Sequence, residues 1–232
     1  MKCCLNIGNT HTQILTVDDN GRRLLRIVPT ADFDPASLPR DTEIAAACVV
    51  AEKMEALRAH GVRLATPETA SKFVDFSSVD ASTLGQDRVA NAVYLAAQGP
   101  LPAVSLDFGT CITAEVVDAR KRFLGGAIFP GRTLTRKALH AYTSKLPLVE
   151  LAEELPPCPG TNTVDAIRMG TDAAAIDAVA GFLARLEKVL GCRSAVYGCG
   201  GDRAFFLLAP GLAGMTDGGD DFTLRGVERL FR

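Results

Sequence analysis

Two short segments of the chain combine glycine with small polar side chains in a pattern that binds phosphate. Residues 5–17 read LNIGNTHTQILTV and residues 106–118 read LDFGTCITAEVVD, and the two align without a gap at an offset of 101. Each predicts a strand, a polar residue, a glycine turn and a second strand. Glycine lets an anion approach the backbone closely, and neighbouring N–H and O–H groups donate to it. Two copies at half-chain spacing indicate duplicated lobes, each with one phosphate-binding turn.

A carboxylate and a guanidinium stand side by side at Asp87 and Arg88, before a helix-like apolar pattern. A carboxylate within hydrogen-bond reach of a hydroxyl can take its proton, and a planar guanidinium can hold a ligand carboxylate. The alternative is structural, because an aspartate here would also cap the helix expected over 88–98. The two roles are compatible, since the positive end of a helix keeps a carboxylate ionised.

Three further positions each have two interpretations. Asp107 ends a predicted buried strand, where an isolated carboxylate is costly, so we expect it to bind a cation, with a buried salt bridge as the alternative. Thr163 begins a long predicted helix. It is either the N-cap of that helix or a contact to the substrate. The pair Gly200 and Gly201 is either a simple turn or a contact on the adenosine side of a nucleotide.

The elements that position these residues are expected to form two α/β lobes. The segment 99–102 (GPLP) predicts a boundary between a lobe at 1–102 and a lobe at 103–232. Strands are expected over 42–50, 103–106 and 194–197, and helices over 51–60, 88–98 and 163–190, the last broken near Gly170.

Composition and charge exclude several classes of protein. With 47% apolar and 22% charged residues in 232, the chain predicts a globular protein with a core. A net charge of −2 excludes a general electrostatic affinity for nucleic acid or anionic membranes. No apolar run approaches the ~20 residues of a membrane helix. The seven cysteines form no CxxC pair or zinc pattern, which favours reduced thiols and the cytoplasm.

An ordered set of motifs resembles the type III pantothenate kinases over nearly the whole chain. The motifs are NIGNTHTQ (6–13), LGQDRVAN (84–91), LDFGTCITAE (106–115), GGAIFPG (125–131), KLPLVEL (145–151), GTNTVDAIRMG (160–170) and CGG (199–201). The resemblance implies an actin-like fold of two ribonuclease-H-like lobes with a nucleotide cleft between them, as a homodimer. It also implies ATP as phosphate donor, Mg²⁺ on its phosphates, an activating K⁺ or NH₄⁺, and pantothenate as the acceptor.

The resemblance also assigns roles by position. It implies that the first turn and a threonine of the second contact ATP: Asn6, Ile7, Gly8, Asn9, Thr10, His11, Thr12, Gln13 and Thr110. It implies that pantothenate is held by Gly85, Gln86, Asp87, Arg88 and, across the dimer interface, Thr163. Asp87 would be the catalytic base, and Asp107 would bind the monovalent cation.

The chain departs from the family pattern at four places. Asn6 stands where the family has an aspartate, Ile112 replaces a threonine, Glu115 replaces an aspartate, and Cys199 replaces a threonine. Asn6 removes a negative charge that would attract Mg²⁺. These changes leave the predicted fold intact and bear on catalysis.

Three hypotheses follow from these residues. The chain is a working pantothenate kinase, a catalytically impaired homologue that acts as a binding or regulatory module, or a kinase or phosphatase of the same superfamily with another acceptor. The presence of Asp87, Arg88 and Asp107 together favours the first.

Overall fold

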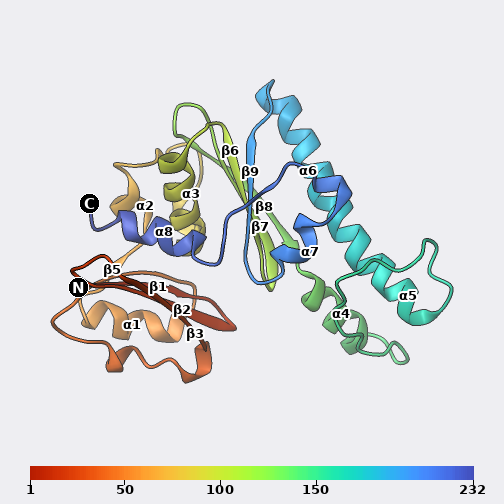
Figure 1. The fold of residues 1–232 in the computed structure, drawn as a ribbon, viewed down its shortest axis with the longest axis horizontal. Coiled ribbons are helices and arrows are strands. Elements are labelled where there is room, and N and C mark those ends of the chain that lie inside the picture. The colour runs from red at the N-terminus through yellow and green to blue at the C-terminus, as the bar shows by residue number, and fades with distance from the viewer. The chain divides into compact units, whose positions relative to one another are not determined.

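The structure is a computed structural model that describes residues 1–232 (Figure 1), and the chain divides into two compact units. Unit 1 comprises residues 1–103, 115–125 and 221–232, and unit 2 comprises residues 104–114 and 126–220. The expected lobes at 1–102 and 103–232 therefore differ from the units at two places. A short segment near the middle of the chain and the last twelve residues both pack with unit 1.

Runs of consecutive strands are interspersed with helices along the chain. The strands are β1 (Lys2–Ile7), β2 (His11–Val17), β3 (Arg23–Pro29), β4 (Glu43–Cys48), β5 (Arg63–Leu64), β6 (Ala103–Phe108), β7 (Cys111–Val117), β8 (Phe123–Pro130), β9 (Ala195–Cys199) and β10 (Thr216–Asp217). The helices are α1 (Ala51–Ala59), α2 (Pro67–Ala70), α3 (Gln86–Gln98), α4 (Arg132–Ala141), α5 (Thr163–Arg168), α6 (Ala174–Leu190), α7 (Arg203–Leu207) and α8 (Phe222–Arg229). No helix is long and apolar enough to cross a membrane.

The sheet of unit 1 has the strand order β3-β2-β1-β4-β5. Strand β1 pairs antiparallel with β2 and parallel with β4, so the sheet is mixed. Alternate residues of β1 and β4, such as Leu5 and Ala46, form a core with Leu57 of α1. The polar residue Asn6 alternates with this core and pairs in register with Gln13 of β2. The turn between β1 and β2 therefore lies at the carboxyl end of a central strand.

Helices α3 and α8 lie side by side in unit 1, although they are far apart in the sequence (Figure 1). A Cβ at Gly226 of α8 would overlap the carbonyl oxygen of Ala90 of α3, so only glycine permits this approach. The rings of Tyr94 and Phe222 pack edge to face, with centroids 4.7 Å apart. Helix α8 thus supports the helix that begins next to Asp87.

The second five-stranded sheet has the order β10-β9-β6-β7-β8, with β9 and β10 parallel. In unit 2, helices α5 and α6 are continuous through a π-helical turn at Met169–Ala173. The expected long helix is confirmed; near Gly170 it contains this π-helical turn, and the expected break is wrong because the helix continues. Helix α6 ends at Gly191, whose φ of +69° is the left-handed conformation typical of a helix stop.

The two glycine turns differ in length. Three residues separate β1 from β2, and the N–H of Gly8 donates to the carbonyl of His11. Two residues separate β6 from β7, and the N–H of Gly109 donates to the carbonyl of Cys111. The ungapped alignment therefore holds through the first strand of each hairpin and shifts by one residue after the turn. The structural counterpart of the buried Thr12 is Ile112, which is also buried, rather than Thr113.

Candidate active site

Thr30 holds residues 8–10, the turn between β1 and β2 that the sequence predicts to bind phosphate and that is called here the first phosphate turn. The hydroxyl of Thr30 donates to the carbonyl of Gly8 at 2.7 Å, and its backbone N–H donates to the carbonyl of Thr10 at 2.9 Å. Its hydroxyl also lies 3.0 Å from that of Thr12, which is fully buried. Thr30 therefore fixes the turn, and no local pattern in the sequence marks it.

The predicted ATP-binding residues of this hairpin differ in their exposure to solvent. The side chains of Ile7 and Thr12 are fully buried, in the core and against Thr30, so they shape the turn from inside. The exposed residues are Asn9, Thr10 and His11 at the tip. Below the tip, the amide of Asn6 donates to Gln13 Oε1 at 3.0 Å. The tip is therefore the exposed polar part of the hairpin.

The carboxylate of Asp87 lies over Gly85 at the start of α3. Helix α3 begins at Gln86 with Gly85 as its N-cap, so Asp87 is the second residue of the helix and the expected capping role is wrong. Its Oδ1 instead accepts the N–H of Arg88 at 2.8 Å. A Cβ at Gly85 would lie 2.6 Å from this oxygen, so glycine leaves the space that the carboxylate occupies. Burial raises the pKa of Asp87, and the hydrogen bond from Arg88 opposes the shift.

Glu115 of β7 binds the guanidinium of Arg88. Arg88 Nε lies 3.1 Å from Oε1 of Glu115, which is fully buried, and the guanidinium lies over the ring of Phe123. The other carboxylate oxygen accepts from Asn91 Nδ2 at 3.2 Å, and Asn91 Oδ1 accepts from the hydroxyl of Thr223 of α8 at 2.8 Å. In the sequence, Glu115 is only a departure from the family pattern. In the structure it orients Arg88.

Gln86, predicted to bind substrate, makes two contacts within unit 1. Its Oε1 accepts the N–H of Cys48 at 3.0 Å, and its Nε2 lies 3.7 Å from the sulfur of Met54. These contacts tie the start of α3 to the end of β4. Gln86 therefore sets the position of Asp87 and Arg88 relative to the sheet.

In unit 2, two glycines, Gly131 and Gly200, allow two other segments to approach the end of β6 closely. The N–H of Gly131 donates to the carbonyl of Thr110 at 3.0 Å, and a Cβ at Gly131 would overlap the carbonyl oxygens of the second phosphate turn. A Cβ at Gly200, whose φ is +88°, would overlap Oδ1 of Asp107. Asp107 and Thr110 are therefore enclosed by the start of α4 and by the glycine turn 198–202. Gly200 is therefore a turn residue that also leaves room for the Asp107 carboxylate.

Thr163 is the first residue of α5, and its side chain is exposed. The N-cap is Asn162, whose side chain accepts the N–H of Asp165 at 3.0 Å, so the expected cap at Thr163 is wrong. A Cβ at Gly160 would lie 2.5 Å from the N of Ala166, so Gly160 packs closely on this first turn. The exposed side chain of Thr163 is accessible to a ligand.

The family model that matches the chain is that of type III pantothenate kinase, over residues 3–185. A type III pantothenate kinase of Akkermansia muciniphila is 38% identical over 144 residues, which are 62% of this chain and 58% of the relative. One of Caulobacter vibrioides is 33% identical over 170 residues, 71% of this chain and 63% of the relative. The chain thus spans less than two thirds of the length of these relatives.

Solved structures confirm the fold. A Campylobacter jejuni protein described as a Baf family transcriptional activator has a TM-score of 0.68 at 18% identity and covers 99% of this chain and 96% of that one. A Sinorhizobium meliloti protein described as a 2-dehydro-3-deoxygalactonokinase has a TM-score of 0.60 at 15% identity, covering 100% and 96%. The predicted α/β architecture is confirmed, with two mixed five-stranded sheets as in actin-like ATPases. By its sequence, the chain belongs to the type III pantothenate kinase family.

Proposed function

We propose that the chain transfers the γ-phosphoryl group of ATP to the primary hydroxyl of pantothenate, the first step of coenzyme A biosynthesis. The observation that carries the proposal is the start of α3, where a carboxylate over Gly85 stands beside a guanidinium held by Glu115. Pantothenate offers the matching groups, a hydroxyl to be deprotonated and a carboxylate to be held.

In this proposal Asp87 accepts the proton of the pantothenate hydroxyl. The hydroxyl oxygen forms a bond to the γ-phosphorus, the bond from that phosphorus to the β–γ bridging oxygen breaks, and ADP leaves with the electron pair. Burial raises the pKa of Asp87 from its ordinary value, which makes the carboxylate a stronger base than an exposed one. Phosphoryl transfer otherwise requires positioning and charge neutralisation rather than covalent help.

Arg88 holds the carboxylate of pantothenate in this proposal. A guanidinium presents five N–H groups in a fixed plane, and Glu115 fixes that plane through Nε. Because Glu115 is fully buried and also held by Asn91, the plane of Arg88 is set before substrate arrives. Preorganisation of this kind lowers the entropy lost on binding.

The nucleotide and its cations complete the proposal. The two glycine turns donate N–H groups to the phosphates, and Asp107 binds the activating K⁺ or NH₄⁺. No group of three or more His, Cys, Asp or Glu side chains is placed to hold a metal ion. The residues of the chain therefore fit a Mg²⁺ ion that is bound mainly by the substrate phosphates and by water, as in many kinases. When bound, Mg²⁺ would neutralise charge on the phosphates.

We further propose a homodimer in which Thr163 of a second copy contacts pantothenate. Unit 2 exposes large apolar side chains that solvent does not favour, namely Ile128, Leu134, Leu148, Leu151 and Val164. Val164 directly follows Thr163. A second copy that covers these side chains would bring Thr163 to its partner.

A coupled assay of ADP release tests the function. We expect release that depends on pantothenate and Mg²⁺ and rises with K⁺. Absence of pantothenate-dependent release in folded protein, across pH and monovalent cations, would contradict the kinase and favour the binding module. Release with another acceptor of similar size would favour a different small-molecule kinase.

A further inference from the structure

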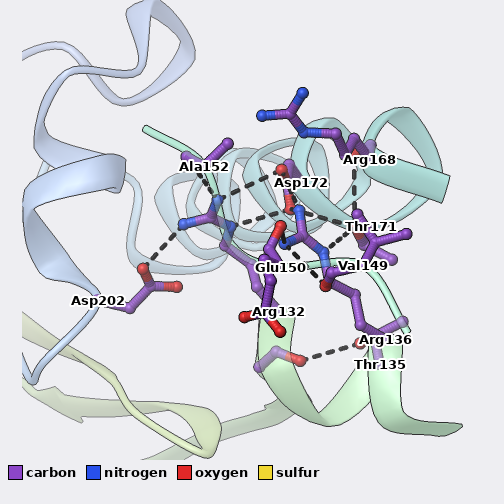
Figure 2. Close-up of polar contacts among 11 residues, drawn as sticks. Arg132, Thr135, Arg136, Val149, Glu150, Ala152, Arg168, Thr171, Asp172 and Asp202 are labelled. Carbon is purple, nitrogen blue, oxygen red and sulfur yellow. Dashed lines mark hydrogen bonds and ion pairs between the residues drawn. The ribbon is translucent and has the colours of Figure 1, made fainter. Parts of the chain in front are cut away.

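Arg132, the first residue of α4, lies at the centre of a buried polar network in unit 2 (Figure 2). Its side chain is 2% exposed. Nε donates to Asp172 Oδ1 at 3.0 Å, and Nη2 donates to Asp172 Oδ2 at 3.3 Å and to the carbonyl of Ala152. Nη1 donates to Asp202 Oδ1 at 2.8 Å. All three nitrogens therefore bind protein acceptors, and the guanidinium joins the π-helical turn to residue 202.

Asp202 ends the glycine turn that approaches Asp107. The backbone N–H of Asp202 donates to the carbonyl of Phe108 at 2.9 Å, directly after Asp107 in the chain. Gly200, two residues earlier, is the glycine whose missing Cβ leaves room for the Asp107 carboxylate. The carboxylate of Asp202 thus fixes one end of the turn that encloses Asp107.

Arg132 also contacts the helix that follows the glycine turn. Its guanidinium carbon lies 3.5 Å from the ring centroid of Phe205 in α7. The next residue, Phe206, stacks on Phe108 with ring centroids 4.0 Å apart. Arg132 therefore contacts both the end of the turn and the helix after it, and both return to the end of β6.

The residue before Arg132 is Gly131, which contacts the second phosphate turn through Thr110. Two consecutive residues at the start of α4 thus hold both segments that surround Asp107. Because Gly131 is the N-cap of α4 and Arg132 is its first residue, both segments are held from one place in the chain.

Arg136, one turn later, shares the carboxylate of Asp172 but does not contact Asp202. Its Nη2 lies 2.6 Å from Asp172 Oδ2, and its Nη1 donates to the carbonyl of Glu150 at 2.5 Å. Asp172 is fully buried and pairs with both guanidiniums, and Asp202 supplies the second negative charge beside Arg132. A variant of Arg136 therefore alters the cluster without removing the contact to the glycine turn.

We propose that Arg132 is a positioning residue for the nucleotide, because it holds the glycine turn 198–202 against Asp107 through Asp202. The inference rests on the proposed kinase function. Transfer of a phosphoryl group depends on placement, and a displacement of about 1 Å can cost about a hundredfold in rate. Loss of the Arg132–Asp202 contact is expected to loosen the turn without unfolding unit 2, since Asp172 still holds Arg132.

The primary test is Asp202→Asn, which keeps the shape of the side chain and removes its charge. We expect faster hydrogen–deuterium exchange over 199–203, weaker ATP binding by calorimetry, and kcat lowered about ten- to a hundredfold with an unchanged KM for pantothenate. Arg132→Lys should shift the same three quantities, because one ammonium cannot reach both carboxylates.

Two control variants distinguish an effect on the glycine turn from a general loss of stability. Arg136→Lys should lower the melting temperature while leaving exchange over 199–203 and ATP affinity at wild-type values. Asp177→Asn makes the same charge change at an exposed position of α6 and should alter nothing. If Arg132→Lys does not fold, Asp202→Asn decides the question.

Wild-type exchange and ATP affinity in Asp202→Asn would overturn the proposal, and so would equal effects of Arg136→Lys and Arg132→Lys. A wild-type protein that binds ATP without phosphorylating pantothenate would contradict the proposed function alone. A wild-type protein that does not bind ATP would contradict both.

Discussion

Asn6 Nδ2 donates a hydrogen bond to Oε1 of Gln13, 3.0 Å away on the paired strand. The pair stands directly below the first phosphate turn, at the position where relatives were expected to carry an aspartate. A neutral amide pair neither attracts Mg²⁺ nor repels phosphate. The turn is therefore held in place by hydrogen bonds whose strength does not depend on a metal ion.

Restoring the acid, Asn6→Asp, should tighten Mg-ATP binding by about 1–2 kcal/mol and raise turnover at limiting Mg²⁺. Gln13 can rotate its amide and donate Nε2 to the new carboxylate, so the hairpin should tolerate the change. Calorimetric ATP affinity with and without Mg²⁺ checks the prediction, and Asn6→Ser, which introduces no charge, is the control. An Asp variant that binds Mg-ATP no better would show that position 6 is remote from the metal.

Asp87→Asn should lower turnover by about 10²–10⁴-fold and leave nucleotide binding nearly unchanged, because only the proton acceptor is lost. Asp80→Asn, in the preceding loop, is the matched control. A variant that keeps most of its rate would show that Asp87 is structural.

The same variant has a predicted effect on stability. Because burial raises the folded-state pKa of Asp87, the ionised carboxylate disfavours the native state above that pKa. Stability from this group is fully present below the unfolded pKa of 3.8 and is lost as pH rises through the folded value. Asp87→Asn should therefore raise the melting temperature at pH 7 and not below pH 3.8. A variant less stable than wild type at pH 7 would contradict this.

Glu115→Gln should raise the KM for pantothenate by about tenfold with little change in the KM for ATP. The amide keeps the shape of the side chain but holds the Arg88 guanidinium less firmly than a carboxylate does. Glu228→Gln, which alters an ion pair with Arg23 in the same unit, is the control. Equal increases in both KM values would indicate a general loss of structure.

Asp107→Ala should abolish stimulation by K⁺ while leaving residual activity in its absence. Rates measured across KCl and choline chloride at constant ionic strength separate a specific cation from screening. Should wild-type activity never depend on a monovalent cation, the role assigned to Asp107 is wrong.

Asp172→Ala should cost about 3–5 kcal/mol in the free energy of unfolding, because it leaves Arg132 and Arg136 buried without their shared carboxylate. Denaturant unfolding measures the loss. Asp165→Ala, at the exposed first turn of α5, is expected to cost no more than about 1 kcal/mol. If Asp172→Ala lowers the free energy of unfolding by no more than Asp165→Ala does, water reaches the cluster.

Local signals in the sequence predicted much of the fold. The strand at 42–50 and the helix at 51–60 follow from apolar periodicity and a glycine stop, and the structure confirms both as β4 and α1. Near Gly170, where a break in the long helix was expected, the structure has a π-helical turn and the helix continues. The first residues of α3 and α5 were predicted less accurately. Gly85 and Asn162 are the N-caps, whereas the sequence pattern also allowed Asp87 and Thr163 in that role.

The site was predicted only where a short motif contains it. Gly85, Asp87 and Arg88 are adjacent in the sequence, so their pattern is visible. Arg132 and Asp172 are forty residues apart, and each resembles a charged residue on an exposed helix face. Their burial depends on packing between segments that are distant in the sequence, and a local hydrophobic periodicity does not predict such packing.

The last helix has a consequence for synthesis on the ribosome. Because residues 221–232 complete unit 1, the first 103 residues emerge long before the partner that α3 requires. Until then the face of α3 around Ala90 and Tyr94 lacks Gly226 and Phe222, and Asn91 lacks the hydroxyl of Thr223. Domains commonly fold in the order of synthesis, but unit 1 of this chain can close only after unit 2 has been made. A nascent chain stalled before residue 221 would expose that apolar face to chaperones.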